Sequence, residues 1–281
     1  MTLPDRVVTP QPTTPSLLGI WRLGELLYTS QHSRLFAAQP ADAEGSPRFD
    51  YVLRTVSEGR DHREASTAQL TRFATAAATA RHPNLIVVLD ASLQSSNPFL
   101  IMPRLVGVTV AQWTMATPSQ PLPVVLWVMR QASQGLAALH AASWMHGDIK
   151  PDNMFVSQQG HLSLIDLGFA RQLGSPSSSS FLGTPRYAAP ERMLDDAPPA
   201  LAASDVYALG KVLLELLTWS APAIRNQSLI EPVAELIAEM INDDHAARPT
   251  LQQVTSRLLR LEIETLGEHI QPPLVATRCA A

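Results

Sequence analysis

The sequence predicts an α+β fold with a small β-rich N-lobe and a larger helical C-lobe. Three observations lead to this prediction. Strand-forming segments dominate the first third of the 281 residues, which holds a single helical pattern. Apolar residues at helical spacing dominate most of the remainder. The hydrophobic fraction of 46% is that of a globular chain, and the length is sufficient to bury a full core.

The N-lobe is expected to consist mainly of strands from Trp21 onward, because β-branched and aromatic residues recur between turn-forming residues. Its predicted strands are residues 34–38, 51–56, 85–90 and 99–102. An alanine-rich segment, residues 66–80, predicts the one helix of this lobe, since alanine has the highest helix propensity.

The C-lobe is expected to begin with a long amphipathic helix after Pro123. Its apolar side chains recur every three or four residues, at Leu126, Met129, Ala132, Leu136 and Leu139. Short strands are expected at residues 154–156 and 162–165, followed by a serine-rich loop at 171–181. The later predicted helices are residues 204–219, 232–241 and 251–266.

Charge and composition argue against several classes of protein. The net charge of −4 leaves no basic footprint, so we expect no nucleic-acid partner. No window approaches the length of apolar chain that a membrane-spanning helix needs. The N-terminus lacks the pattern of a signal peptide, and the one cysteine, Cys279, fits a reducing compartment. We therefore expect a cytoplasmic protein without membrane partners.

Three short motifs carry the functional information. They are H-G-D-I-K-P-D-N at residues 146–153, D-L-G at 166–168 and A-P-E at 189–191. In this order they resemble the catalytic loop, the metal-binding triplet and the end of the activation segment in protein kinases. The resemblance extends from about Trp21 to Leu261, and the coincidence of three motifs makes it specific.

The resemblance implies a protein-kinase-like domain at residues 18–266. Its N-lobe would cover residues 18–103 and its C-lobe residues 106–266. Residues 1–17, with prolines among threonines, are expected to form a disordered leader, and residues 267–281 a C-terminal tail.

The resemblance also gives four polar residues roles in phosphoryl transfer, which depends on alignment and charge neutralisation. Asp148 would orient a substrate hydroxyl and accept its proton, and Lys150 would face the oxygens of the moving phosphoryl group. Asn153 and Asp166 would offer oxygen ligands to Mg²⁺. The alternative for each carboxylate is a local role as a turn former, and for Asn153 a role as a helix cap.

Lys150 and the segment Gly183-Thr184-Pro185 resemble the serine/threonine branch of the family, in which the threonine bridges the catalytic aspartate and lysine. The implied substrate is therefore a Ser/Thr hydroxyl of a protein, with Thr184 in the activation segment. A kinase of small molecules is an alternative, but the Gly-Thr-Pro and Ala-Pro-Glu segments shape a peptide-binding shelf and count against it.

Three further residues match structural positions of the family. Glu191 and Arg248 would form an ion pair, and Asp205 would receive backbone amides of the catalytic loop. For Asp205 the alternative is an ordinary carboxylate at the start of a helix.

The same alignment places residues around ATP. Those expected to bind the nucleotide are Leu27, Leu35, Val52, Arg54, Met102, Pro103, Leu105 and Phe155. Pro103 and Leu105 would offer the carbonyl and the amide that adenine needs. For each apolar member of the set, ordinary core packing is the alternative.

The N-lobe departs from the family in three places. Residues 28–33 stand where a glycine-rich loop is expected and contain no glycine, so backbone amides approach phosphate less easily. Arg54 replaces the lysine that holds the ATP phosphates, and a surface arginine is the alternative. No acidic residue occupies positions 70–73, where the partner glutamate is expected, and Glu64 lies too far before His82.

A fourth departure concerns regulation. Gly147 replaces the arginine that commonly receives an activation-loop phosphate. We therefore expect activity not to require phosphorylation of the serine-rich loop, unless another basic residue such as Arg171 or Arg186 takes over this role.

Taken together, these residues predict an ATP- and Mg²⁺-dependent protein serine/threonine kinase, which the altered N-lobe could make slow. The alternative is a pseudokinase that acts as a nucleotide-binding or scaffolding module. The complete set of C-lobe residues favours catalysis, and the altered N-lobe favours the alternative.

Overall fold

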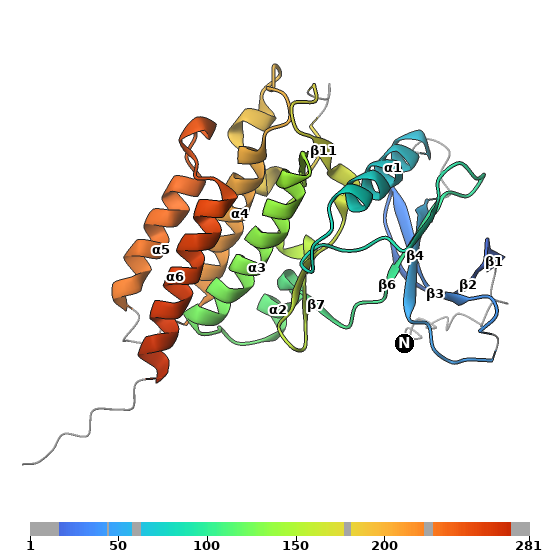
Figure 1. The fold of residues 1–281 in the computed structure, drawn as a ribbon, viewed down its shortest axis with the longest axis horizontal. Coiled ribbons are helices and arrows are strands. Elements are labelled where there is room, and N and C mark those ends of the chain that lie inside the picture. Colours follow the sequence, from blue (N-terminus) through green and yellow to red (C-terminus); the bar gives the residue numbers. More distant parts are fainter. Residues whose placement is uncertain (1–16, 44, 58–62, 177–180, 222–226, 271–281) are drawn as a thin grey trace, which may run out of the picture. The chain divides into compact units, whose positions relative to one another are not determined.

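A computed structural model of the chain describes residues 17–43, 45–57, 63–176, 181–221 and 227–270. The fold divides into two compact units, which we call the first unit (residues 1–71 with 88–104) and the second unit (residues 72–87 with 105–281). Strands dominate the first unit and helices the second, which confirms the predicted α+β class (Figure 1). Nearly all of the predicted leader and most of the predicted tail lie outside the described residues.

The first unit is built on a six-stranded antiparallel sheet with the order β1-β2-β3-β4-β6-β5. Its strands are β1 (Leu17–Leu18), β2 (Trp21–Thr29), β3 (Ser33–Pro40), β4 (Tyr51–Val56), β5 (Asp90–Ser92) and β6 (Phe99–Pro103). One face buries a cluster that includes Trp21, Leu53 and Ile101. The indole Nε1 of Trp21 also donates to Asp90 Oδ2 at 2.8 Å, which ties the first long strand to the far edge of the sheet. The predicted strands at 34–38, 51–56 and 99–102 are confirmed.

The predicted strand at residues 85–90 is wrong, because only Asp90 lies in a strand. The segment changes its bonding partner part-way along. The Ile86 amide donates to the carbonyl of Leu164 in the second unit, at 2.9 Å. The Leu89 amide instead donates to the carbonyl of Ile101 in the first unit, at 2.8 Å. A segment that passes from one unit to the other cannot pair continuously with a single strand.

The second unit is mainly helical (Figure 1). Its helices are the second half of α1 (Arg63–Thr79), α2 (Val110–Ala116), α3 (Leu122–Ala141), α4 (Ala202–Trp219), α5 (Gln227–Met240) and α6 (Leu251–Ile270). Its short strands are β7 (Gly107–Thr109), β8 (Trp144–Met145), β9 (Met154–Ser157), β10 (Leu162–Leu164) and β11 (Arg171–Gln172). Residues 72–87 therefore group with the helical unit, whereas the sequence placed them in the N-lobe.

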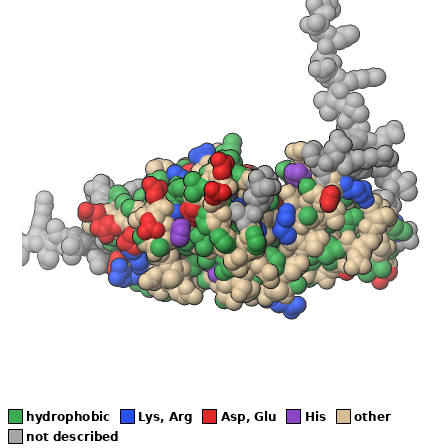
Figure 2. Space-filling view, turned by 90° about the horizontal axis from the view of Figure 1, so that it is seen from above, with side chains coloured by type: hydrophobic (Ala, Val, Ile, Leu, Met, Phe, Trp, Pro, Cys, Tyr) green, Lys and Arg blue, Asp and Glu red, His purple; other side chains and the backbone are tan. Residues whose placement is uncertain are grey.

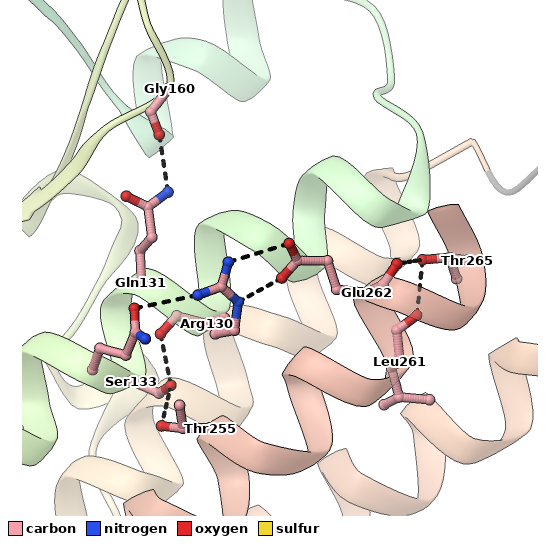
Figure 3. A network of polar contacts seen from close by, with 9 residues as sticks. Arg130, Gln131, Ser133, Gly160, Thr255, Leu261, Glu262 and Thr265 are labelled. Carbon is pink, nitrogen blue, oxygen red and sulfur yellow. Dashed lines mark hydrogen bonds and ion pairs between the residues drawn. The ribbon is translucent and has the colours of Figure 1, made fainter. Parts of the chain in front are cut away.

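Helix α3 forms the centre of the second unit and is joined to α6 by buried and half-buried polar contacts (Figure 3). The guanidinium of Arg130 binds the Glu262 carboxylate through two bonds, Nε to Oε2 at 2.6 Å and Nη2 to Oε1 at 3.2 Å. The hydroxyls of Ser133 and Thr255 also lie 2.8 Å apart. Because α3 leads directly into β8 and the segment that follows it, these contacts fix the base from which residues 146–153 emerge.

The hairpin of β9 and β10 is fixed to α3 by the amide side chain of Gln131. Its Nε2 donates to the Gly160 carbonyl at 2.9 Å (Figure 3). Its Oε1 accepts from the Leu162 amide at 3.0 Å and from Asn84 Nδ2 at 3.3 Å. This hairpin connects residues 146–153 to residues 166–168, so the two motifs are held on a common frame.

The surface mixes side chains of all types. On the face shown in Figure 2, basic and acidic side chains are interspersed with apolar ones, and no continuous basic surface covers this face. Within the described residues, no helix has both the length and the apolar character needed to cross a membrane.

Candidate active site

The segment of residues 146–153, which we call the catalytic segment, is anchored by Asp205 in the first turn of α4. The Asp205 carboxylate is almost fully buried and accepts from the amide of His146 at 2.7 Å and from that of Gly147 at 2.9 Å. His140 Nε2 lies 2.9 Å from Asp205 Oδ2. Burial alone would raise the pKa of Asp205, but these contacts outweigh it and hold the pKa below its usual value. A buried anion therefore fixes the backbone of the catalytic segment.

The backbone of this segment requires glycine at position 147. Gly147 has φ +80°, in the left-handed region, and a Cβ built there would lie 2.5 Å from the carbonyl oxygen of Phe169. Four residues on, the chain turns through a short 3₁₀ helix, Pro151–Asn153, in which the Asn153 amide donates to the Lys150 carbonyl at 3.0 Å. These two turns bring Asp148, Lys150 and Asn153 to the same side of the segment.

Asp148 lies at the centre of a compact polar set. Its Oδ1 accepts from Thr184 Oγ1 at 2.7 Å, and its Oδ2 lies 2.9 Å from Lys150 Nζ. Lys150 Nζ also donates to Thr184 Oγ1 at 2.8 Å. Asn153 Nδ2 donates to the Asp148 carbonyl at 2.8 Å and to its Oδ2 at 3.0 Å. The structure thus brings the carboxylate and the ammonium of one motif together with the hydroxyl of Thr184, more than 30 residues further along the chain.

Asn153 and Asp166 lie on adjacent segments. The Ile165 amide donates to the Asn153 carbonyl at 2.9 Å, which places Asp166 next to this residue. Asp166 adopts φ 64° and ψ 76°, and its Oδ1 accepts from the Gly168 amide at 3.1 Å. Since Asn153 Nδ2 points to Asp148, the side-chain oxygen Oδ1 of Asn153 makes no hydrogen bond to another described residue.

The described residues hold no cluster of three or more His, Cys, Asp or Glu suited to a metal ion. One carboxylate and one amide oxygen nevertheless fit Mg²⁺, which typically takes one or two protein oxygens and completes its shell with phosphates and waters. The donor chemistry of Asn153 and Asp166 therefore fits this ion, but no histidine- or cysteine-rich centre is formed by the described part of the chain.

The A-P-E motif, which follows Thr184, contributes one partner of a buried ion pair. Arg248 donates from Nη1 and Nη2 to the two carboxylate oxygens of Glu191, each at 2.8 Å, and Ser204 Oγ donates to Oε1 at 2.7 Å. Burial raises the pKa of Glu191, but the bonds from Arg248 and Ser204 outweigh this effect and leave the pKa below its usual value. This pair, expected from the sequence, secures the chain that follows Thr184.

The residues expected to bind ATP are divided between the two units. In the first unit, Leu35 is paired with Arg54, and Val52 with Met102, across neighbouring strands. Directly paired residues share a face, and so do alternate residues of one strand. These four side chains therefore lie on one face of the sheet, opposite Leu53, whose face belongs to the buried cluster.

The other expected ATP residues occupy varied positions. Leu27 lies at an irregularity of β2, between Leu26 and Tyr28, so alternation does not assign its face. Pro103 ends β6 in the first unit. Leu105 opens the long segment of the second unit, and Phe155 lies in β9 opposite Thr109.

The turn that replaces a glycine-rich loop satisfies its own backbone. Between β2 and β3, the Ser30 amide donates to the Ser33 carbonyl at 2.8 Å. Ser30 Oγ accepts from the amides of Ser33 at 3.1 Å and His32 at 3.4 Å. Three amides of this turn are therefore already engaged within it.

Helix α1 carries no carboxylate at the expected position. Glu64 is exposed in its first turn, whereas Leu70 and Phe73 are buried. Arg72 instead donates from Nε to the Gly168 carbonyl at 3.2 Å. This contact between α1 and the D-L-G motif was not predicted, because the family resemblance implies only an acidic residue at positions 70–73.

The polar set around Asp148 and the order of the three motifs along the chain both point to the same family. Residues 50–259 match the protein kinase domain family. This chain belongs to the protein kinase domain family. The predicted resemblance is thereby confirmed for most of the C-lobe and for the strands that begin with β4.

Several bacterial kinases are similar to this kinase domain. It is 36% identical over 177 residues to the serine/threonine-protein kinase PknL of Mycobacterium tuberculosis (strain CDC 1551 / Oshkosh), covering 60% of this chain and 44% of PknL. It is 30% identical over 220 residues to the serine/threonine-protein kinase PknB of Mycobacterium leprae (strain TN), covering 75% and 34% of the two chains. With the serine/threonine-protein kinase PrkC of Bacillus subtilis (strain 168) it shares 30% identity over 178 residues, 62% of this chain and 26% of PrkC. The matched region thus spans less than half the length of each of these relatives.

Proposed function

We propose that this kinase domain transfers the γ-phosphoryl group of ATP, in the presence of Mg²⁺, to Ser/Thr hydroxyls of protein substrates. The observation that carries the proposal is the arrangement of Asp148, whose carboxylate oxygens lie 2.7 Å from Thr184 Oγ1 and 2.9 Å from Lys150 Nζ. The domain proposed to carry the activity is residues 18–266.

Asp148 would act as the base. The substrate hydroxyl oxygen forms a bond to the γ-phosphorus, the bond from that phosphorus to the ADP oxygen breaks, and the hydroxyl proton passes to the Asp148 carboxylate. A positioned base of this kind contributes about 10²–10⁴-fold to a rate. Lys150 would neutralise charge on the transferred group, since its ammonium already lies beside the carboxylate that meets the hydroxyl.

Asn153 and Asp166 would hold Mg²⁺ through one amide oxygen and one carboxylate. The ion, when bound, supplies charge neutralisation for the phosphates of ATP. The protein contributes the fixed spacing of the two ligands, which the bond between the Ile165 amide and the Asn153 carbonyl maintains.

Two lines of support favour Ser/Thr substrates. Thr184 is hydrogen-bonded to both Asp148 and Lys150, which is the arrangement that the serine/threonine branch of the family implies. The similar chains PknL, PknB and PrkC are all named serine/threonine-protein kinases. The cytoplasmic location expected from the sequence is part of the same proposal.

A second candidate, a pseudokinase that binds nucleotide or a partner without transferring phosphate, has an observation of its own. The amides of the turn between β2 and β3 bind oxygen atoms of Ser30 and Ser33, so fewer are directed outward for a phosphate. Arg54 in place of lysine adds to this argument.

Intact-mass spectrometry after incubation with Mg-ATP and a generic Ser/Thr protein substrate, such as casein, separates the two candidates. The wild type should transfer phosphate to the substrate or to itself, and the Asp148→Asn variant should lose about 10²–10⁴-fold in rate because an amide cannot take the proton. Circular dichroism checks that the variant is folded. Equal transfer by both proteins would remove Asp148 as the base, and no transfer by either would favour the pseudokinase.

A further inference from the structure

A hollow of about 340 Å³ lies in the second unit at the end of α1, and we call it the docking hollow. The described residues that line it all belong to the stretch 77–87. Alanines at the end of the helix, Ala77 and Ala80, leave space because their side chains are small. Leu85, Ile86 and Val87 complete an apolar lining. The volume falls within the range of ligand sites, about 300–1,000 Å³.

The stretch that forms the docking hollow is bound to the β9–β10 hairpin. The Ile86 amide donates to the Leu164 carbonyl at 2.9 Å, and the Leu164 amide donates to the Asn84 carbonyl at 2.8 Å. Asn84 Nδ2 also donates to the Leu162 carbonyl at 2.6 Å. A site whose backbone is already held in place loses little conformational entropy when it binds a partner. The docking hollow is therefore preorganised.

The rim of the docking hollow is basic, and none of the described residues that line it is acidic. Arg81 is exposed and makes no hydrogen bond or ion pair with another described residue. His82 lies next to it, and its Nδ1 accepts from the Asn84 amide at 3.1 Å. Burial, followed by the positive charge of His161, lowers the pKa of His82. His82 is therefore neutral at pH 7, and the Arg81 guanidinium is the cation of the rim.

The shape of the docking hollow favours a segment of a protein over a free small molecule. A small-molecule site typically surrounds about 70–90% of the surface of its ligand. Here one short stretch of chain forms the lining, and the Val87 side chain at its edge is 42% exposed. Such a surface can hold one side chain while the rest of a partner lies outside it. The guanidinium of Arg81 matches a carboxylate of that partner in charge and in geometry.

We propose that the docking hollow binds a segment of a partner protein in which an apolar side chain is followed by acidic ones. The apolar side chain packs against the lining of the hollow, and a carboxylate of the segment binds the Arg81 guanidinium. A contact of one side chain and one charged pair is much smaller than a stable protein interface, so the association is weak and reversible.

Docking at this hollow is independent of the proposed phosphotransfer, because none of the residues proposed for transfer lines it. The test uses the full chain with labelled methyl groups of alanine, isoleucine and valine, observed by NMR. The probes are synthetic peptides of glycine and serine that contain one leucine, followed at one to four positions by two aspartates. At least one spacing should shift the methyl signals of Ile86 and Val87 in a saturable way. The same peptide with lysines in place of the aspartates should not.

Two substitutions in the docking hollow should weaken binding of the aspartate peptide. Arg81→Gln should raise its dissociation constant about tenfold or more, because a charge-assisted hydrogen bond is lost. Val87→Asp should abolish binding, because it places a negative charge beside the acidic segment. Helix α6 offers matched controls, since Arg260 is also an exposed arginine and Leu259 is 42% exposed, as Val87 is. Arg260→Gln and Leu259→Asp should leave the dissociation constant unchanged.

Several outcomes would overturn the proposal. One is the absence of a saturable shift with every aspartate peptide at about 1 mM, a concentration that detects even weak binding. Another is binding that survives both Arg81→Gln and Val87→Asp. Equal shifts with the aspartate and lysine peptides would contradict the role of Arg81. Saturable shifts with sodium octanoate, but with none of the peptides, would assign the hollow to a free carboxylate instead of a protein segment.

Discussion

The two units of this kinase domain hold their functional residues in different ways. In the second unit, Asp148 has three side-chain partners within 3.0 Å, and the catalytic segment behind it is tied to a buried carboxylate. In the first unit, the turn between β2 and β3 bonds mainly to itself, and Arg54 stands where the family has lysine. The residues proposed to carry out phosphoryl transfer thus lie in one unit, while the other unit departs from its family.

This difference indicates that the chemical step and the binding of the nucleotide can be tested separately. A change in the polar set of the second unit should affect the chemical step or the stability of that unit. A change in the first unit should affect how the nucleotide is held. The predictions below use this separation and run from the largest expected effect to the smallest.

Glu191→Ala should destabilise the protein most, by about 3–5 kcal/mol, because it leaves the fully buried Arg248 guanidinium without its carboxylate. Chemical denaturation followed by circular dichroism measures the change. Glu239→Ala is the matched control, since its partner Arg257 is in a partly exposed pair and its loss should cost less than about 1 kcal/mol. Equal effects of the two substitutions would contradict the structural role of the buried pair.

Asp166→Ala should abolish the Mg²⁺-dependent part of the stabilisation by ATP. A ligand at 100 times its dissociation constant stabilises a protein by about 2.7 kcal/mol, and the carboxylate is one of two proposed ligands for the ion. A thermal-shift titration with Mg-ATP measures the loss. Asp152→Ala, which removes an exposed carboxylate from the same region, should keep the shift. An unchanged shift in Asp166→Ala would exclude Asp166 from the metal site.

Gly147→Ala should destabilise the second unit by about 1–3 kcal/mol, because it forces a side chain into a left-handed backbone. The built Cβ would also lie 2.5 Å from the Phe169 carbonyl oxygen. Gly174→Ala is a close control: its φ of +78° is nearly the same, but no atom lies within 4 Å of the new Cβ. The first substitution should cost more than the second, and the difference measures the close approach alone.

Arg54 variants should have the smallest effect and should act on nucleotide binding. Arg54→Ala should raise the KM for Mg-ATP if the residue faces the phosphates, and Arg34→Ala, on the other face of the sheet, should not. Arg54→Lys restores the family's residue, and in a site adapted to arginine it should lower the rate. A higher rate with lysine would indicate a site that has decayed.

Much of the second unit could be predicted from the sequence because its functional residues lie in short motifs. Asp148, Lys150 and Asn153 are fixed by local turns, so their spacing along the chain already determines their geometry. The partners Thr184 and Asp205 came from the resemblance. Helical periodicity placed α3, α4 and α6 correctly because their buried faces repeat at regular spacing.

The features that the sequence did not predict depend on contacts between distant segments. The Arg72 guanidinium donates to the Gly168 carbonyl, although the two residues lie 96 positions apart and share no local pattern. The strand expected at residues 85–90 has strand-like composition, but its hydrogen bonds go to different partners. The internal bonding of the turn at Ser30 could not be predicted, since a serine there predicts a turn but not the acceptor of its amides.

The most direct test of this account is steady-state kinetics with Mg-ATP on the wild type, Asp148→Asn and Arg54→Ala, measured side by side. We expect Asp148→Asn to lower kcat by about 10²–10⁴-fold with little change in nucleotide affinity. Arg54→Ala should mainly raise the KM for ATP. A wild type that transfers no more phosphate than Asp148→Asn would contradict the claim that the second unit carries the chemistry.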